Sequence, residues 1–372
     1  MFYAFSSGDK DLTKLLELFT DLIFTPKINE EMLQKAKYQA IDEMNVICMN
    51  RDPEIFLKNQ LLYKSAFQGT PLANSIIYTE EELSSISIDD IHEHLSTLHT
   101  PENVVIASIG PEPDEICNLC SKIPSKSNNS KIKNYDFNTF ESQKSFITHN
   151  IDLSRMNNGL NSLPELAHIL VALPLPFHPS NDEDLKLYCA QLLLQTLFGG
   201  GSSFSSGGPG KGLHSKFYTE NLNRYHWLSH LSASIKHCSG HSGFLMIQGS
   251  CEPRYINKLA NMLSYECLEK LYRPCMRLSD FNRSKKQLKM NMYLSQEQDP
   301  VLMENIATEW IRFGKWLDSS SLSQAIDELQ IQDVDLVAKK IVEGNMSIVA
   351  MGNLHDIPDQ KYFEKNHNIV LM

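Results

Sequence analysis

The sequence predicts an α+β fold made of two homologous domains, each a mostly antiparallel sheet with helices packed on one face. Three observations predict this fold. A series of helices, a proline stop, an Asp-Pro pair and an apolar strand occurs twice along the chain. The length of 372 residues is more than one ordinary domain needs. An apolar content of 42% is sufficient for a large core.

The first copy of the series ends at Gly110. Residues 11–23 carry apolar side chains at helical spacing, and this helix stops at Phe24-Thr25-Pro26, because the residue before a proline leaves the α region. Three more helices are predicted over residues 29–44, over 54–65 after Asp52-Pro53, and over 88–98. The apolar run 104–110 then predicts a strand.

The second copy repeats this order in the carboxyl-terminal half. It comprises a strand at 244–247, a helix over 256–271 stopped at Pro274, a segment 281–287 that parallels 33–39, Asp299-Pro300, a helix over 334–342 and a strand over 345–352. Two matching series are stronger evidence than any single motif. They indicate a duplicated α+β domain.

The second half contains elements that precede the shared series. They are a strand at 167–173, a helix that starts at the capping box Ser180-x-x-Glu183 and reaches Phe198, a helix carrying Leu213, Phe217 and Leu222, and strands over 227–235 and 243–250. The first half has no counterpart, since it begins at Phe2–Phe5, which corresponds to the later strand. We therefore expect the first domain to lack its amino-terminal part.

The predicted domains are residues 1–120 and 147–372. Between them lies a linker, 121–146, that is rich in serine, asparagine and lysine. No run of about 18 apolar residues predicts a membrane span, and no secretory leader is visible.

The net charge is −11, which disfavours nucleic acid as a partner and is compatible with a cationic peptide. The cysteines are scattered and do not suggest a disulfide framework, so a reducing compartment is favoured; they stand at positions 48, 117, 120, 189, 238, 251, 267 and 275.

A glycine-rich segment, residues 199–212, follows the helix that ends at Phe198. It contains seven glycines in fourteen residues, which are costly to order, so a flexible connector is one interpretation. A phosphate-binding loop is another, but Ser205 and Gly212 occupy positions where that motif requires glycine and a hydroxyl residue. Phosphate binding is therefore disfavoured.

No catalytic or metal-ligating set is evident in the sequence. His-x-x-Glu-His does not occur, and His92 and His94 point to different faces of a helix. His226 and His230 could share a strand face, but no further ligand is near them in sequence. Glu43 alone cannot form a zinc site, and Cys117-x-x-Cys120 lacks the second pair of a zinc ribbon. We predict no catalytic residue and no metal ligand in this chain.

The glycine-rich segment continues into Ser215-Lys216-Phe217-Tyr218 and Leu222-Asn223-Arg224-Tyr225-His226-Trp227. This long string resembles the α subunits of the mitochondrial processing peptidases, which belong to the pitrilysin/insulinase-type metallopeptidase superfamily. Weaker landmarks extend the resemblance over nearly the whole chain. They are Phe24-Thr25-Pro26-Lys27, Arg51-Asp52-Pro53-Glu54, Thr100-Pro101-Glu102, Leu163-Pro164-Glu165-Leu166-Ala167-His168 and Gly352-Asn353-Leu354.

The resemblance implies a non-catalytic subunit in the mitochondrial matrix, inactive alone, that recognises the presequences of imported precursors. It implies a heterodimer with a homologous β subunit, which would hold zinc on a His-x-x-Glu-His helix, so no cofactor is expected in this chain. The substrate-binding residues implied are Gly199, Gly200, Gly201, Ser202, Ser203, Phe204, Gly207, Gly208, Pro209, Gly210, Lys211 and Gly212. Exposed backbone groups of such a loop can pair with an extended peptide.

Two other functions stay open at this point. A structural core subunit of the respiratory bc1 complex belongs to the same superfamily, although such a core has less need of a complete glycine-rich loop. An independent metallopeptidase is disfavoured because the zinc helix is missing from these residues.

Overall fold

The computed structural model describes residues 3–6, 8, 11–50, 54–121, 142–150, 166–179, 182–202, 213–238, 243–274 and 276–372. The chain divides into two compact units. Unit 1 comprises Met1–Asn50, Ile77–Tyr135 and Asp299–Ile311, and unit 2 comprises Arg51–Ile76, Asp136–Gln298 and Arg312–Met372. The predicted domain boundaries stay a prediction, because most of the predicted linker lies outside the described residues.

Unit 1 is helical in its described part. Its helices are α1 (Leu12–Phe24), α2 (Glu30–Asn50), α4 (Glu80–Ser85), α5 (Ile88–Leu98), α6 (Pro113–Cys120) and most of α11 (Asp299–Phe313). Capping boxes at Thr79 and Ser87 begin α4 and α5. Lys37 donates to the carbonyl oxygens of Ser84 and Ile86 at 3.0 and 2.6 Å, which ties α2 to the link between α4 and α5.

The predicted strand at residues 104–110 is wrong. The described residues 104–110 follow the short helix Pro101–Asn103 as irregular chain, and residues 3–6 form no strand either. Val105, Ile106 and Ile109 are exposed there. The apolar pattern is typical of a strand, but a strand also needs a paired neighbour, and the described part of unit 1 offers none.

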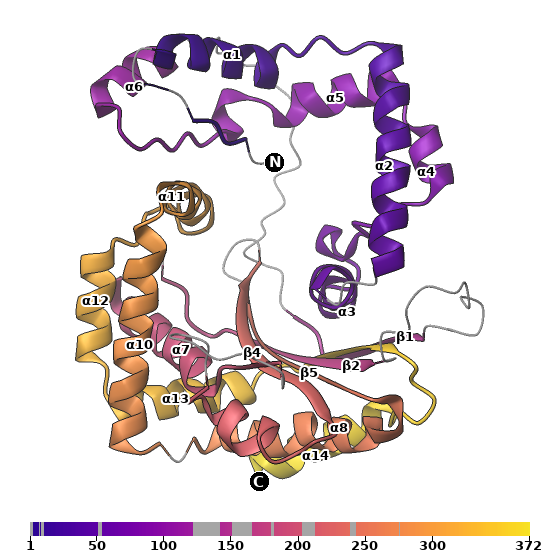
Figure 1. The fold of residues 1–372 in the computed structure, drawn as a ribbon, viewed down its shortest axis with the longest axis vertical. Coiled ribbons are helices and arrows are strands. Elements are labelled where there is room, and N and C mark those ends of the chain that lie inside the picture. Colours follow the sequence, from indigo (N-terminus) through magenta and orange to yellow (C-terminus); the bar gives the residue numbers. More distant parts are fainter. Residues whose placement is uncertain are drawn as a thin grey trace. The chain divides into compact units, whose positions relative to one another are not determined.

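Unit 2 contains a six-stranded sheet in the order β1-β6-β2-β5-β4-β3 (Figure 1). The strands are β1 (Ser145–Asn150), β2 (Ala167–Pro174), β3 (Gly200–Ser202), β4 (Leu228–His237), β5 (Gly243–Cys251) and β6 (Ser347–Gly352). Only β1 and β6 pair in parallel; the other described pairings are antiparallel. The prediction of an α+β fold with a mostly antiparallel sheet is confirmed.

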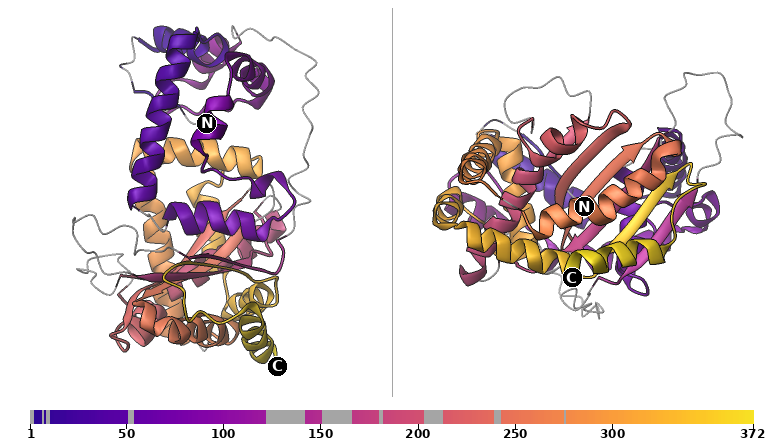
Figure 2. Two further views of the ribbon diagram at one scale, coloured as in Figure 1. Left: turned by 90° about the vertical axis from the view of Figure 1, so that its right-hand side faces the viewer. Right: turned by 90° about the horizontal axis from the view of Figure 1, so that it is seen from below.

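One face of this sheet carries the main helical layer (Figure 1, Figure 2). The helices of unit 2 beyond this sheet face are α7 (Asp182–Phe198), α8 (Ile256–Asn261), η9 (Met262–Glu266), α9 (Cys267–Tyr272), α10 (Leu278–Gln296), α12 (Ser319–Glu328), α13 (Ile331–Val342) and α14 (Gln360–Leu371). Ile169, Val171 and Leu173 alternate along β2 and are completely buried in the larger core. Residues two apart share a sheet face, so this alternation sets which face the helices cover.

A smaller core lies on the opposite face. The π-helix η2 (Glu54–Leu61) and α3 (Leu62–Ala66) bury Leu57 and Leu62 against strand residues that include Phe244 and Val349. The Oγ atoms of Ser65 and Ser145 lie 2.6 Å apart, which joins α3 to β1. Of the helices in the described ranges, none is both long and apolar enough for a bilayer span.

Candidate functional site

The glycine-rich segment begins in a close approach of two backbones. Helix α7 ends at Phe198, and Gly199 and Gly200 follow with φ angles of +47° and +103°, which disfavour any residue with a Cβ. A Cβ on Gly200 would lie 2.0 Å from the carbonyl oxygen of Leu231. Glycine at this position is therefore required by packing, whatever the rest of the segment does.

Residues 200–202 form the edge strand β3, so this start of the segment is not a free connector. Gly200, Gly201 and Ser202 pair with Ser232, Leu231 and His230 of β4. The carbonyl oxygen of Gly199 also accepts a hydrogen bond of 2.7 Å from the amide of Ala233. The segment thus starts at the last position of the sheet order, where its other side meets no strand of the described residues.

The residues that follow the segment, from Leu213 onward, lie next to its first residues. Ser215 is buried, and its Oγ accepts a 2.9 Å hydrogen bond from the amide of Gly200. Phe217 is also buried, with its ring centroid 5.1 Å from that of Phe198 at the end of α7. The described residues on both sides of the segment are therefore in contact with each other.

The structure places Gly199, Gly200, Gly201 and Ser202 of the predicted site in and beside β3. The remaining predicted residues lie outside the described part of the chain; they are Ser203, Phe204, Gly207, Gly208, Pro209, Gly210, Lys211 and Gly212. Sequence reasoning missed the anchoring role of Ser215. Its only sequence signal is its place three residues after the last glycine.

A row of polar side chains crosses the sheet next to β3. His168 of β2 pairs with Ser250 of β5, Ser250 pairs with His230 of β4, and His230 pairs with Ser202. Burial and, to a smaller extent, the neighbouring His230 lower the pKa of His168 to about 4. Burial also lowers the pKa of His230, with a smaller contribution from Lys58. Both histidines are therefore neutral at pH 7.

The described residues bring together no group of three or more histidine, cysteine, aspartate or glutamate side chains that could hold a metal ion. His226 is exposed before β4, whereas the Nε2 of His230 lies 2.9 Å from the Oγ of Ser232. Glu43 is exposed on α2. Burial raises the pKa of the Cys189, Cys251 and Cys267 thiols to about 12, so these thiols are protonated and unreactive at pH 7.

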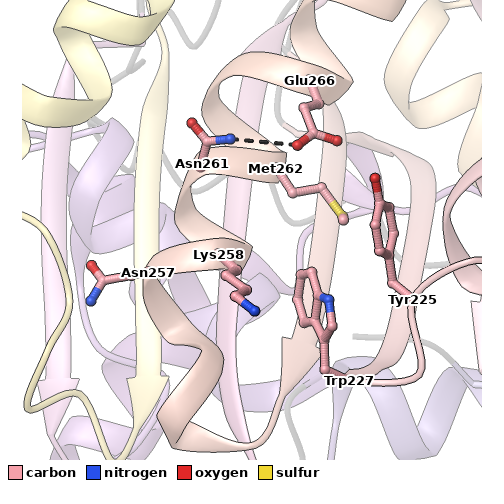
Figure 3. A pocket seen from close by; sticks show the side chains of 7 residues that line it. All are labelled: Tyr225, Trp227, Asn257, Lys258, Asn261, Met262 and Glu266. Carbon is pink, nitrogen blue, oxygen red and sulfur yellow. Dashed lines mark hydrogen bonds between the residues drawn. The ribbon is translucent and has the colours of Figure 1, made fainter.

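An aromatic groove of about 500 Å³ lies on the helical side of unit 2. Tyr225 and Trp227 line it together with Met262 from η9, as Figure 3 shows. The Tyr225 and Trp227 ring centroids are 5.7 Å apart. Lys258 and Glu266 add one charge of each sign at its walls. Such a groove can hold an apolar side chain with a polar neighbour.

A second groove, of about 670 Å³, lies beside the point where the glycine-rich segment returns. His214 and Lys216 line it, and six of its side chains are lysine or arginine against three carboxylates. The lining of this groove therefore carries a positive charge, although the net charge of the whole chain is −11. Neither groove was predicted, because their residues come from segments far apart in the sequence.

Comparison with known proteins places these features in a family. Residues 85–288 match the family model described as peptidase M16 inactive domain, and residues 1–80 match the model described as insulinase, peptidase family M16. Mitochondrial-processing peptidase subunit alpha of Pongo abelii is 25% identical over 366 residues, covering 97% of this chain and 68% of the relative. The protein of the same name in Caenorhabditis elegans is 25% identical over 379 residues, covering 98% and 71%. The resemblance predicted from the glycine-rich string is confirmed.

Solved structures share the fold. A chain of complex III2 from Candida albicans, determined with Inz-5 bound, superposes with a TM-score of 0.75 at 17% identity, covering 98% of this chain and 81% of that one. A protease from Helicobacter pylori superposes with a TM-score of 0.70 at 14% identity, covering 93% and 77%. At these identities the likeness shows the fold alone.

Proposed function

Because this chain belongs to peptidase family M16, we propose that it is the substrate-recognition subunit of a heterodimeric mitochondrial processing peptidase. The match of residues 85–288 to the inactive domain of the family supports a non-catalytic subunit. In this proposal the chain works in the mitochondrial matrix and presents presequences to zinc held by a β subunit.

The observation that carries the proposal is the anchoring of the glycine-rich segment. Gly200 is held against Leu231 on one side and by Ser215 on the other. The segment therefore leaves and re-enters at the edge of the sheet, where β3 pairs with β4 on one side only among the described strands. An extended peptide can add to such an edge through main-chain hydrogen bonds, while small residues permit close approach.

Charge supports the same substrate class. Mitochondrial targeting segments are rich in arginine and poor in acidic residues. A protein of net charge −11 attracts them over a distance of about 8–10 Å at ordinary ionic strength. The attraction accelerates encounter more than it strengthens the complex, so the loop still has to supply the specific contacts.

The alternative function, a structural core subunit of the bc1 complex, is not favoured. Its best support is the fold shared with a complex III chain at 17% identity, which does not bear on function. The relatives named as processing-peptidase α subunits cover a similar share of this chain at higher identity.

The decisive experiment shortens the segment and keeps the described residues that anchor it. Residues 203–210 are deleted, so that β3 and Ser215 stay in place. With the β subunit present, we expect presequence affinity to be lost while the melting temperature changes little. Isothermal titration with a presequence peptide and calorimetry measure the two quantities. Unchanged affinity after this deletion would contradict the proposal.

A further inference from the structure

The second groove, which His214 and Lys216 line, carries an excess of basic side chains that has no role in the proposed function. Three parts of unit 2 contribute to it: the short helix η7 (Tyr218–Leu222) with the residues on either side of it, the end of α9 and the start of α10. Its lining residues are His214, Lys216, Thr219, Glu220, Arg224, Glu269, Lys270, Arg273, Arg277, Asp280 and Arg283.

Several of these charges already have partners inside the protein. Lys270 pairs with Glu220 at 3.0 Å, and Arg283 pairs with Asp280 at 3.0 Å. Lys216 donates to the carbonyl oxygen of Pro274. These contacts account for two of the three carboxylates in the groove.

Three arginines of the groove take no part in these ion pairs. Arg224, Arg273 and Arg277 are exposed, and none of them forms an ion pair with a carboxylate of the described residues. Each guanidinium group offers a planar fork of N–H donors that matches a carboxylate or a phosphate. Of the three carboxylates in the groove, only Glu269 opposes them without an ion pair to a described cation.

The other lining residues narrow the class of ligand. Among the described residues, no tyrosine, tryptophan or phenylalanine lines the groove, so none of them is placed to stack on a nucleotide base. A flat anionic membrane surface suits a projecting basic patch, whereas this site is concave. Its volume of about 670 Å³ admits several residues of an extended peptide. A cationic presequence is repelled here.

We propose that this groove binds an acidic polypeptide segment, whose carboxylates pair with Arg224, Arg273 and Arg277. This inference rests on the proposed function: the segment bound in the groove is an acidic stretch of the precursor that lies outside the cationic presequence. His214 joins the groove to the end of the glycine-rich segment, so both parts of one precursor can be held at once. Opposite charge then selects which part of the precursor enters which site.

Fluorescence anisotropy on the full chain tests this, with a labelled peptide of about ten residues made of glutamate and serine. A peptide with lysine in place of glutamate is the comparison ligand, and inorganic phosphate is the competitor. The double variant Arg273→Glu/Arg277→Glu should bind the acidic peptide about tenfold more weakly. The control Lys361→Glu reverses the charge of an exposed residue of α14 that does not line the groove, and this variant should bind normally.

Folding of the double variant is checked by circular dichroism, and the milder Arg224→Gln should still weaken binding if the pair fails to fold. Equal binding of the two peptides by the native chain overturns the proposal. So does unchanged affinity in the double variant, or full displacement by phosphate at concentrations similar to the peptide's. Chains lacking residues 203–210 should still bind the acidic peptide, and the double variant should still bind a presequence. Failure of this inference is therefore distinct from failure of the proposed function.

Discussion

Replacing Gly200 by alanine tests the close approach between β3 and β4. The new methyl group would lie 2.0 Å from the carbonyl oxygen of Leu231, which is backbone and cannot rotate away. The φ angle of +103° adds strain of about 1–3 kcal/mol. Separating β3 from β4 to relieve the contact weakens the pairing of Gly200–Ser202 with β4, which costs about 1–3 kcal/mol more. We therefore expect Gly200→Ala to lower the free energy of unfolding by about 4 kcal/mol.

The neighbouring Gly201 supplies the matched control. Its φ is +152°, and no atom lies within 4 Å of a Cβ built there, so Gly201→Ala meets strain without a clash. Urea unfolding of both variants, followed by circular dichroism, measures the difference. The clash predicts that Gly200→Ala is the less stable variant by about 1–3 kcal/mol. Equal stabilities would refute the reasoning, and with it the view that the segment starts from a fixed position.

Three other predictions concern the same region. Ser215→Ala should cost about 1–2 kcal/mol in urea unfolding, because the amide of Gly200 loses its acceptor; a Ser215→Ala variant as stable as the native chain would contradict this anchoring. The free energy of unfolding should fall as the pH drops from 6.5 towards 4. His168 has a pKa of about 4 in the folded chain and about 6.5 in the unfolded chain, so the unfolded chain takes up the proton first. This histidine accounts for about 3 kcal/mol of the decrease at most. Urea titrations at several pH values should show a smaller dependence in His168→Gln, and an identical dependence would reject the assignment. Presequence affinity of the heterodimer should decline as salt rises from about 50 to 500 mM, because screening shortens the reach of the negative charge; titration calorimetry that finds no salt dependence would point to apolar recognition instead.

Helical periodicity was enough to predict many of the helices, whereas the predicted capping box at Ser180 lies outside the described residues. The helix predicted over 88–98 has those bounds in the structure, since Ser87 and Asp90 form the capping box that starts it. The predicted strands in the second half are also present as β2, β4, β5 and β6. Local signals succeed where the side chains that decide the element lie within a few residues of each other.

The predictions are wrong or incomplete where the local structure depends on residues that are far away in the sequence. Residues 104–110 have the composition of a strand but no paired neighbour in the described part of unit 1. Gly200–Ser202 have the opposite character, since two glycines and a serine disfavour a strand, yet β4 pairs with them. The anchoring of the predicted site by Ser215, and both grooves, likewise depend on contacts between separate segments that one sequence does not reveal.

The position of β6 in the sheet has a consequence for how the chain folds during synthesis. This strand lies between β1 and β2, and it pairs with both, although it comes about 200 residues after β1 along the chain. Until residue 352 has left the ribosome, β1 has no neighbour and β2 is paired on one side only. The edge of β2 that later pairs with β6 is therefore exposed in the nascent chain, and an unpaired strand edge promotes aggregation.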